Sequence, residues 1–212
     1  MAVSLVSTGV QFPDSNIQTT ASIAAMTLVQ TISPTSGTTV TITGLTATYK
    51  QYLIQILNLK TDSSSAFTDS TSLQLVMSQN GGSSYYSTRY SYGATVLSAG
   101  ENVGTGSSGG QGNISSWPID SKVSSRATSQ LSGEVIVYSP GTTSTVPVVT
   151  WNIVSTWAPQ PGYGASSTIN AMGMGMNYAF GYNTANSLNA LQFSWANGSN
   201  FTGGTFKVYG IS

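Results

Sequence analysis

The chain has 212 residues, of which only 6% are charged, and its six Lys and Arg balance its six Asp and Glu to a formal net charge of zero. It has no cysteine and no histidine, which excludes disulfides, thiolate chemistry, imidazole acid–base catalysis and the usual nitrogen and sulfur ligands of metals. Its 39% hydrophobic residues, with four Trp and eleven Tyr, exclude a disordered chain.

Residues 1–25 are predicted to form an N-terminal arm that serves in docking or assembly, because their apolar residues are too sparse for a core. They contain no basic region followed by a continuous apolar run, so we expect no signal peptide. No stretch of the chain approaches the ~20 apolar residues of a membrane span. We therefore expect a soluble protein that is not exported by a recognisable signal.

From about residue 27 onward, short apolar and β-branched runs alternate with Gly, Pro, Ser and Asn, which is typical of strands and turns. The run 50–59 has few polar interruptions, which predicts a strand covered on both faces. The expected strands are residues 27–32, 38–43, 50–59, 72–78, 84–92, 131–139, 146–157, 168–180, 188–195 and 204–211.

Turn signals separate several of these strands. Pro34 and Gly37 suit a tight turn, Pro140-Gly141 separates two strands, and Asn80-Gly81 is a strong hairpin signal because both residues tolerate positive φ. The segments 61–71, 99–116 and 158–167 are predicted to be loops. The middle one is rich in glycine, and we expect it to be flexible unless another part packs on it.

Residues 168–180 show the clearest single pattern. Met172, Met174, Met176, Tyr178 and Phe180 recur at every second position, with small residues between them. A period of two places all five on one face of a strand. We expect this bulky face to point inward and the glycine-bearing face to point outward.

No amphipathic helix of three turns is evident. These patterns predict an all-β fold, an antiparallel β-sandwich of jelly-roll type formed by residues 26–212, preceded by the extended arm of residues 1–25.

The acidic residues offer little support for catalysis. Glycosidases need two carboxylates about 5–10 Å apart, but the six acids fall mostly in turn-like or solvated contexts: Asp14, Asp62, Asp69, Glu101, Asp120 and Glu134. Asp62 and Asp69 bracket a Ser-rich loop that could offer oxygens to Ca²⁺, without the spacing of an EF-hand. We predict no enzymatic activity, no cofactor and no metal. The scattered Lys and Arg predict no binding of nucleic acid.

Aromatic residues could form platforms for sugar rings, with neighbouring amides and hydroxyls binding the sugar's OH groups. The candidates for glycan binding or a subunit contact are Tyr85, Tyr86, Tyr90, Tyr92 and Tyr163. Trp151 and Trp157 could serve in the same way. The alternative, which is the more common role of such residues, is that they belong to the core or to a subunit interface.

Two segments carry a resemblance to a known class of proteins. Residues 9–21, GVQFPDSNIQTTA, resemble a motif common in tail-fibre and other virion proteins of tailed bacteriophages, with Ser15 where glycine is usual. Residues 201–211, FTGGTFKVYGI, look like the closing strand of many phage structural β-domains. The resemblance implies a virion protein that forms homo-oligomers, with a homotrimer expected, and that has no catalytic residues. It also implies an assembly arm that includes Phe12, Pro13, Asp14, Ile17 and Gln18.

The resulting hypothesis is a short tail fibre or tail-associated adhesin that is assembled in the host cytoplasm and exposed on the particle surface. The arm would dock to other virion proteins of the tail or baseplate, and the sandwich would meet a host-surface glycan through its loops. The alternative is a capsid decoration or cement protein that stabilises the head shell. A carbohydrate-processing enzyme is a minor alternative.

Overall fold

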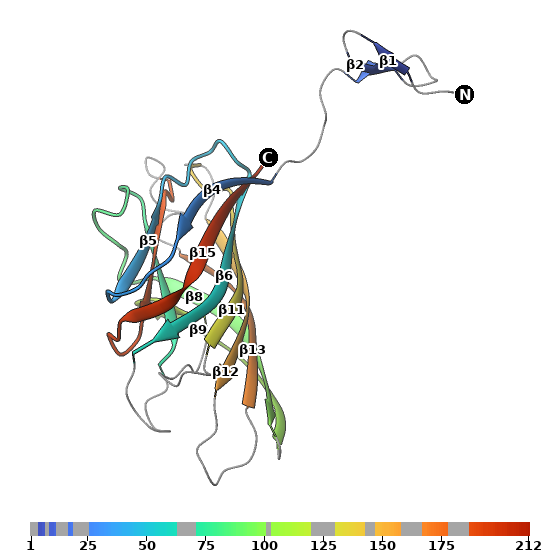
Figure 1. Cartoon of the computed structure of the whole chain (residues 1–212). Helices are drawn as coiled ribbons and strands as arrows, with labels where there is room; N and C mark the ends of the chain where they lie inside the picture. Colours follow the sequence, from blue (N-terminus) through green and yellow to red (C-terminus); the bar gives the residue numbers. More distant parts are fainter. Residues whose placement is uncertain are drawn as a thin grey trace.

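The structure is a computed structural model, which describes residues 4–6, 9–11, 17–18, 26–62, 71–100, 103–119, 130–142, 147–157, 167–177 and 187–212. Within these residues all regular structure is β, and every strand pairing is antiparallel. Figure 1 shows a large sheet and a smaller sheet packed face to face. The predicted antiparallel β-sandwich is confirmed.

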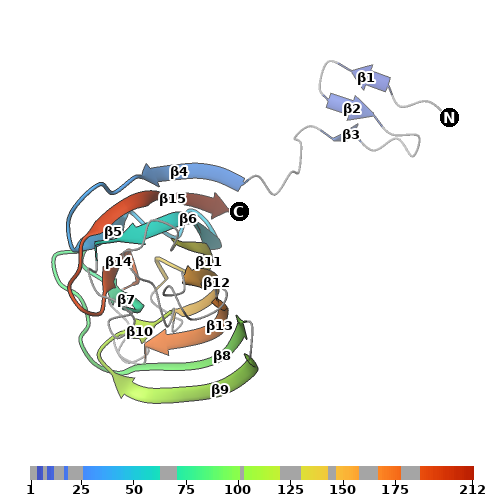
Figure 2. The same cartoon turned by 60° about the horizontal axis from the view of Figure 1, so that its bottom comes forward.

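The large sheet has eight strands in the order β4-β15-β6-β11-β12-β13-β8-β9. It curls around the smaller sheet, so that its outer face is convex (Figure 2). Its strands are β4 (Met26–Ile32), β15 (Phe201–Ile211), β6 (Gln51–Thr61), β11 (Gln130–Tyr138), β12 (Val148–Trp157), β13 (Ser167–Asn177), β8 (Tyr90–Gly100) and β9 (Val103–Ile114).

The smaller sheet has four strands in the order β10-β7-β14-β5. They are β10 (Trp117–Pro118), β7 (Leu73–Ser78), β14 (Ala190–Trp195) and β5 (Thr39–Thr43). A third sheet of three short strands, β1 (Ser4–Val6), β2 (Gly9–Gln11) and β3 (Ile17–Gln18), lies in the N-terminal segment. The segment predicted as an extended arm thus contains a small antiparallel sheet.

Eight strands of the sandwich pair in a nested order. The first of them, β4, pairs with the last, β15; β5 pairs with β14, β6 with β11, and β7 with β10. This nested order is the pairing expected of the eight strands of a jelly roll. The remaining strands, β12-β13 and β8-β9, are two inserted hairpins that extend the large sheet beyond β11.

The hydrophobic core lies between the two sheets. In β6, Tyr52, Ile54 and Ile56 are buried, whereas the alternate residues Leu53 and Leu57 are only half-buried. The prediction that this strand is covered on both faces is therefore wrong: one face belongs to the core and the other faces outward. Each fully buried aliphatic side chain of this kind stabilises the fold by about 1.5–3 kcal/mol.

The orientation predicted for residues 168–180 is also wrong at Gly175, in β13. Gly175 is buried, and a Cβ at this position would come within 2.6 Å of Cε2 and Nε1 of Trp117. The glycine positions therefore face the core, because the buried indole occupies the space that a side chain would need. By register, Met174 and Met176 pair with Thr150 and Val148. Tyr178 and Phe180 lie outside the described residues.

Of three predicted connections, one turns out differently. The strand predicted at 84–92 begins only at Tyr90, and β7 and β8 belong to different sheets, so Asn80-Gly81 does not close a hairpin. The turn at Pro34 and Gly37 likewise lies between strands of different sheets, β4 and β5. The Pro140-Gly141 connection joins the paired strands β11 and β12, as a hairpin does.

The glycine-rich segment expected to be a loop forms most of strand β9, which pairs with β8 along its length. Glycine fits there for a local reason. At a register shift beside Tyr92, a Cβ on Gly110 would come within 2.6 Å of the Tyr92 carbonyl oxygen. Period-two patterning could not identify this strand, because residues without side chains show no alternation.

Candidate functional site

One end of the sandwich gathers several loops, one of which carries the predicted residues Tyr85 and Tyr86. We call it the tyrosine end and define it as residues 44–50, 79–89, 139–142 and 187–189. Asn189 joins three of its neighbours: its backbone nitrogen donates to Ser78 O (3.0 Å), its carbonyl accepts from Leu45 N (3.1 Å), and its Nδ2 donates to Gln79 O (2.9 Å). The loops at this end are thus tied to each other and to β7.

The Asn80-Gly81 segment forms a closed polar turn within this end. Asn80 Oδ1 accepts hydrogen bonds from Ser78 Oγ (2.8 Å) and Ser84 N (2.9 Å), and Asn80 Nδ2 donates to Ser84 Oγ (2.7 Å). Gly81, with φ of 71°, donates its N–H to Asn189 Oδ1 (2.8 Å). The turn fixes the start of the segment that carries Tyr85 and Tyr86.

Four of the five predicted tyrosines lie within the described residues, and their environments differ. Tyr90 is fully buried. Its hydroxyl accepts a hydrogen bond from Met77 N (2.7 Å) and donates one to Tyr86 O (3.1 Å). Its ring lies edge-on to the Trp117 ring, with the ring centroids 5.0 Å apart. Tyr92 packs against the core and lies 6.3 Å from the Trp151 ring. Tyr90 is therefore a core residue and cannot stack on a glycan.

Tyr85 and Tyr86 are half-buried and remain accessible. The hydroxyl of Tyr85 lies 3.4 Å from Thr41 Oγ1, and the hydroxyl of Tyr86 donates to Gln79 Oε1. Burial raises the pKa of Tyr86 above its ordinary value of 10.0, so its hydroxyl is neutral at physiological pH. Tyr163 and the predicted arm residues Phe12, Pro13 and Asp14 lie outside the described residues.

Gln79, Ser84, Tyr85 and Tyr86 line a hollow of about 100 Å³. Hydroxyl and amide groups beside aromatic rings are suited to binding a polar ligand. A typical ligand pocket, however, measures about 300–1,000 Å³, and a water molecule takes about 30 Å³. The hollow therefore fits a few waters or one substituent of a larger molecule, and not a whole sugar ring.

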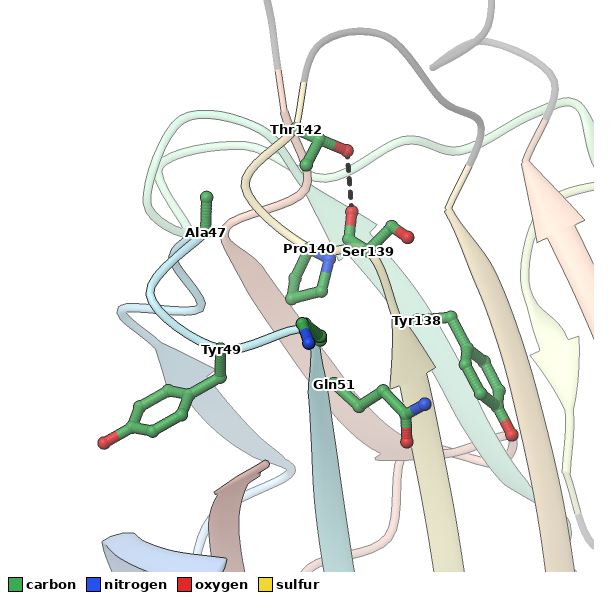
Figure 3. Close-up of a pocket in the computed structure, with 8 residues that line it drawn as sticks. Ala47, Tyr49, Gln51, Tyr138, Ser139, Pro140 and Thr142 are labelled. Carbon is green, nitrogen blue, oxygen red and sulfur yellow. Dashed lines mark hydrogen bonds between the residues drawn. The ribbon is translucent and has the colours of Figure 1, made fainter. Parts of the chain in front are cut away.

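A second hollow, of about 330 Å³, lies at the same end between the 44–50 loop and the end of β11. Figure 3 shows Pro140 at its centre, with the rings of Tyr49 and Tyr138 pointing to opposite sides and away from each other. Thr142 Oγ1 donates to Ser139 O (2.9 Å) along its wall. The rings of Tyr49 and Tyr138 therefore cannot stack on the two faces of one planar ligand.

Two of the six acids lie within the described residues, and they have separate roles. Asp62 accepts hydrogen bonds from Asn200 N (2.7 Å) and Asn200 Nδ2 (2.6 Å), which lower its pKa, the side-chain bond most. These bonds join the end of β6 to the start of β15. Glu134 is exposed on the outer face of β11. In the part of the chain that the structure describes, no three acidic residues gather where they could hold a metal ion. Asp69, which brackets the same Ser-rich loop as Asp62, lies outside that part.

The N-terminal segment joins the sandwich at the tyrosine end. Met26 pairs with Ile211, whose carbonyl accepts from Lys50 N (2.9 Å). Of the predicted arm residues, Ile17 and Gln18 form β3 and pair with Gln11 and Val10. The opposite end of the sandwich, which we call the far end, carries the exposed loops 33–38 and 196–200.

Sequence patterns could not identify the residues of the larger hollow. Tyr49 and Tyr138 are separated by 89 positions along the chain. The pairing of Gln51 with Tyr138 and the hydrogen bond from Ser139 N to Lys50 O (3.0 Å) bring the two segments together. The Pro140-Gly141 turn signal was the one local indication of this region.

Comparison of the chain with protein-family models, with curated proteins and with solved structures gave no match. A search of the described residues found no helix with the length and apolar character needed to cross a membrane.

Proposed function

We propose that this protein is a non-enzymatic structural component of a tailed-bacteriophage particle, a short tail fibre or tail-associated adhesin. Its N-terminal segment docks to other virion proteins, and its sandwich faces the bacterial surface. The proposal depends on the FPDSNIQTTA segment, which resembles phage virion proteins. That segment is joined to a rigid antiparallel sandwich of a kind also used in viral coat proteins.

The surface chemistry of the chain supports a structural role. Only 6% of its residues are charged, against about 25% in typical soluble proteins. A neutral surface rich in hydroxyls and amides gives little repulsion between copies. Such a surface suits a protein that is permanently assembled with other subunits.

The point of attachment assigns roles to the two ends. Since the N-terminal segment enters at Met26, beside Ile211 and Lys50, docking through that segment turns the tyrosine end toward the particle. Tyr85 and Tyr86 then serve in a contact with the particle and not in glycan binding. The far-end loops 33–38 and 196–200, with exposed Asn197 and Thr35, face the host and carry recognition.

A pair of matched variants tests this assignment. Thr35→Trp places a bulky ring on an exposed far-end loop, and Ser83→Trp does the same at the tyrosine end. We expect Thr35→Trp to weaken binding of the full chain to host cells and Ser83→Trp to leave it unchanged, while Ser83→Trp alone impairs incorporation into particles. The reverse result would contradict the orientation, and failure of the unmodified chain to enter particles would contradict the proposed function.

A further inference from the structure

The outer face of the large sheet is organised in rows that run across the strands. Cross-strand partners define each row, because directly paired residues lie on the same face. One row runs Met26–Ile211–Gln51–Tyr138–Val148, and the next runs Leu28–Tyr209–Leu53–Ile136–Thr150. A third row runs Thr31–Lys207–Gln55–Glu134–Asn152.

The first two rows form an apolar belt across five strands. Its members on β4, Met26 and Leu28, are each 53% exposed, and the remaining apolar members are half-buried: Ile211, Tyr209, Leu53, Ile136, Tyr138 and Val148. Contiguous apolar surface of this extent on a soluble protein marks a contact with another molecule.

The third row is polar, and its charges are placed symmetrically about β6. Lys207 lies on β15, one strand to one side of Gln55, and Glu134 lies on β11, one strand to the other side. The ordinary spacing of strands puts the two charges about 10 Å apart. Consider a second copy that faces the first across a two-fold axis parallel to β6. This axis would place β11 of the second copy against β15 of the first, and it would leave each row at the same height along β6.

In two copies related by such an axis, each row of one copy would lie against the same row of the other copy. Lys207 of one copy would face Glu134 of the other, twice in each pair, while Gln55 faces Gln55 and Leu53 faces Leu53. Face-to-face sheets pack about 10 Å apart with their strands inclined by about 30°. The charge pattern therefore selects a second copy of this chain over an unrelated partner.

Five strands and three rows measure about 24 Å by about 20 Å at the usual spacings, or about 500 Å² on each copy if the face were flat. Because the outer face is convex (Figure 2), two copies bury less than the roughly 1,000 Å² that this area would give, and the strands nearest β6 carry the contact. The pair therefore belongs to the weak, transient class of interfaces. The apolar belt would form the centre and the polar row part of the rim, as in known interfaces.

We propose that two copies of this chain associate through the apolar belt and the Lys207–Gln55–Glu134 row, around a two-fold axis along β6. This arrangement replaces the trimer implied by the phage resemblance, because an isologous contact of this kind pairs two copies. It is independent of the proposed virion role and is tested on the purified chain.

Charge reversal tests the axis directly, with the full chain measured by analytical ultracentrifugation. K207E and E134K each place like charges in two contacts of the pair, and each is expected to raise the dimer Kd about tenfold at low salt. The double variant K207E/E134K restores opposite charges and is expected to recover the original Kd. Failure of the double variant to recover, or a trimer in the unmodified chain, would overturn the proposal.

The belt has its own matched pair of variants. Leu53→Lys puts two positive charges on the axis and is expected to abolish the dimer. Val154→Lys replaces an apolar residue of 38% exposure on the same outer face, outside the belt, and is expected to leave it intact. Circular dichroism of both variants establishes that they fold. A monomeric unmodified chain, or equal effects of the two folded variants, would refute the interface.

Discussion

Gly175→Ala should destabilise the protein because it places a methyl group where the Trp117 indole lies. The added Cβ would sit 2.6 Å from Cε2 and Nε1 of Trp117, whereas carbon atoms pack at about 3.5–4.0 Å. The indole must therefore move by about 1 Å. It has little room, because it is fully buried, lies 5.0 Å from the Tyr90 ring, and donates from Nε1 to Ser91 O (3.0 Å).

The expected cost follows from these contacts. Overpacking of a core costs about 1–3 kcal/mol, and weakening the indole hydrogen bond adds about 1 kcal/mol. A total of about 2–4 kcal/mol corresponds to a fall in Tm of about 5–15 °C for a chain of this size. Differential scanning calorimetry and urea denaturation measure both quantities.

Gly93→Ala is the matched control. Gly93 lies on the adjacent strand β8, opposite Met174, and a Cβ there would have no heavy atom within 4 Å. Alanine should be neutral or stabilise by up to about 1 kcal/mol, since glycine in a strand costs conformational entropy. Equal stability of the two variants would refute the conclusion that the glycine face of β13 points into the core.

Two further predictions concern hydrogen bonds. Tyr90→Phe should lower the free energy of unfolding by about 1–3 kcal/mol in urea denaturation, because it leaves the buried Met77 N–H without its acceptor. Tyr85→Phe, the control, should lower it by less than about 0.5 kcal/mol. A similar loss in both variants would contradict the assignment of Tyr90 to the core. The pKa of Asp62 lies below its ordinary value of 3.8 because of Asn200, so its contribution to stability is present above pH 3.8 and is lost as the pH falls through the lowered pKa. In Tm measurements from pH 2 to pH 6, Asp62→Asn should therefore lie below the unmodified protein at high pH and approach it at low pH, and a constant difference would argue against the Asp62–Asn200 bonds.

The fold class was accessible from the sequence because short β-branched runs and turn residues are local signals. The strands around Val135 and Ile54 were found in this way, and so was the Pro140-Gly141 hairpin. Sheet membership was not accessible, since it depends on contacts between distant segments. Asn80-Gly81 illustrates this: the dipeptide forms a tight polar turn, but the chain then crosses to the other sheet.

The two errors about glycine have one physical origin. A period of two tells which residues of a strand share a face, but it does not tell which face is buried. In β13 the large residues were expected inside, yet Trp117 already fills the space above Gly175. In β9, glycines such as Gly110 were assigned to a loop, although an edge strand beside the Tyr92 bulge accepts them.

The candidate site was predicted only in part. Tyr85 and Tyr86 are accessible, as a contact role requires, while Tyr90 is a core residue because the ring fills space beside Trp117. The outer-face rows could not be derived from sequence, because they require the register of five strands. Lys207 and Glu134 are far apart in the chain, and only β6 between them makes their symmetry visible.

Immunogold electron microscopy of purified phage particles, with antibody against the full chain, tests the proposed virion role. We expect labels on intact particles, in few copies and confined to the tail. Labels in many copies over the head shell would contradict the fibre assignment in favour of a decoration protein. Particles without any label would contradict the structural virion role itself.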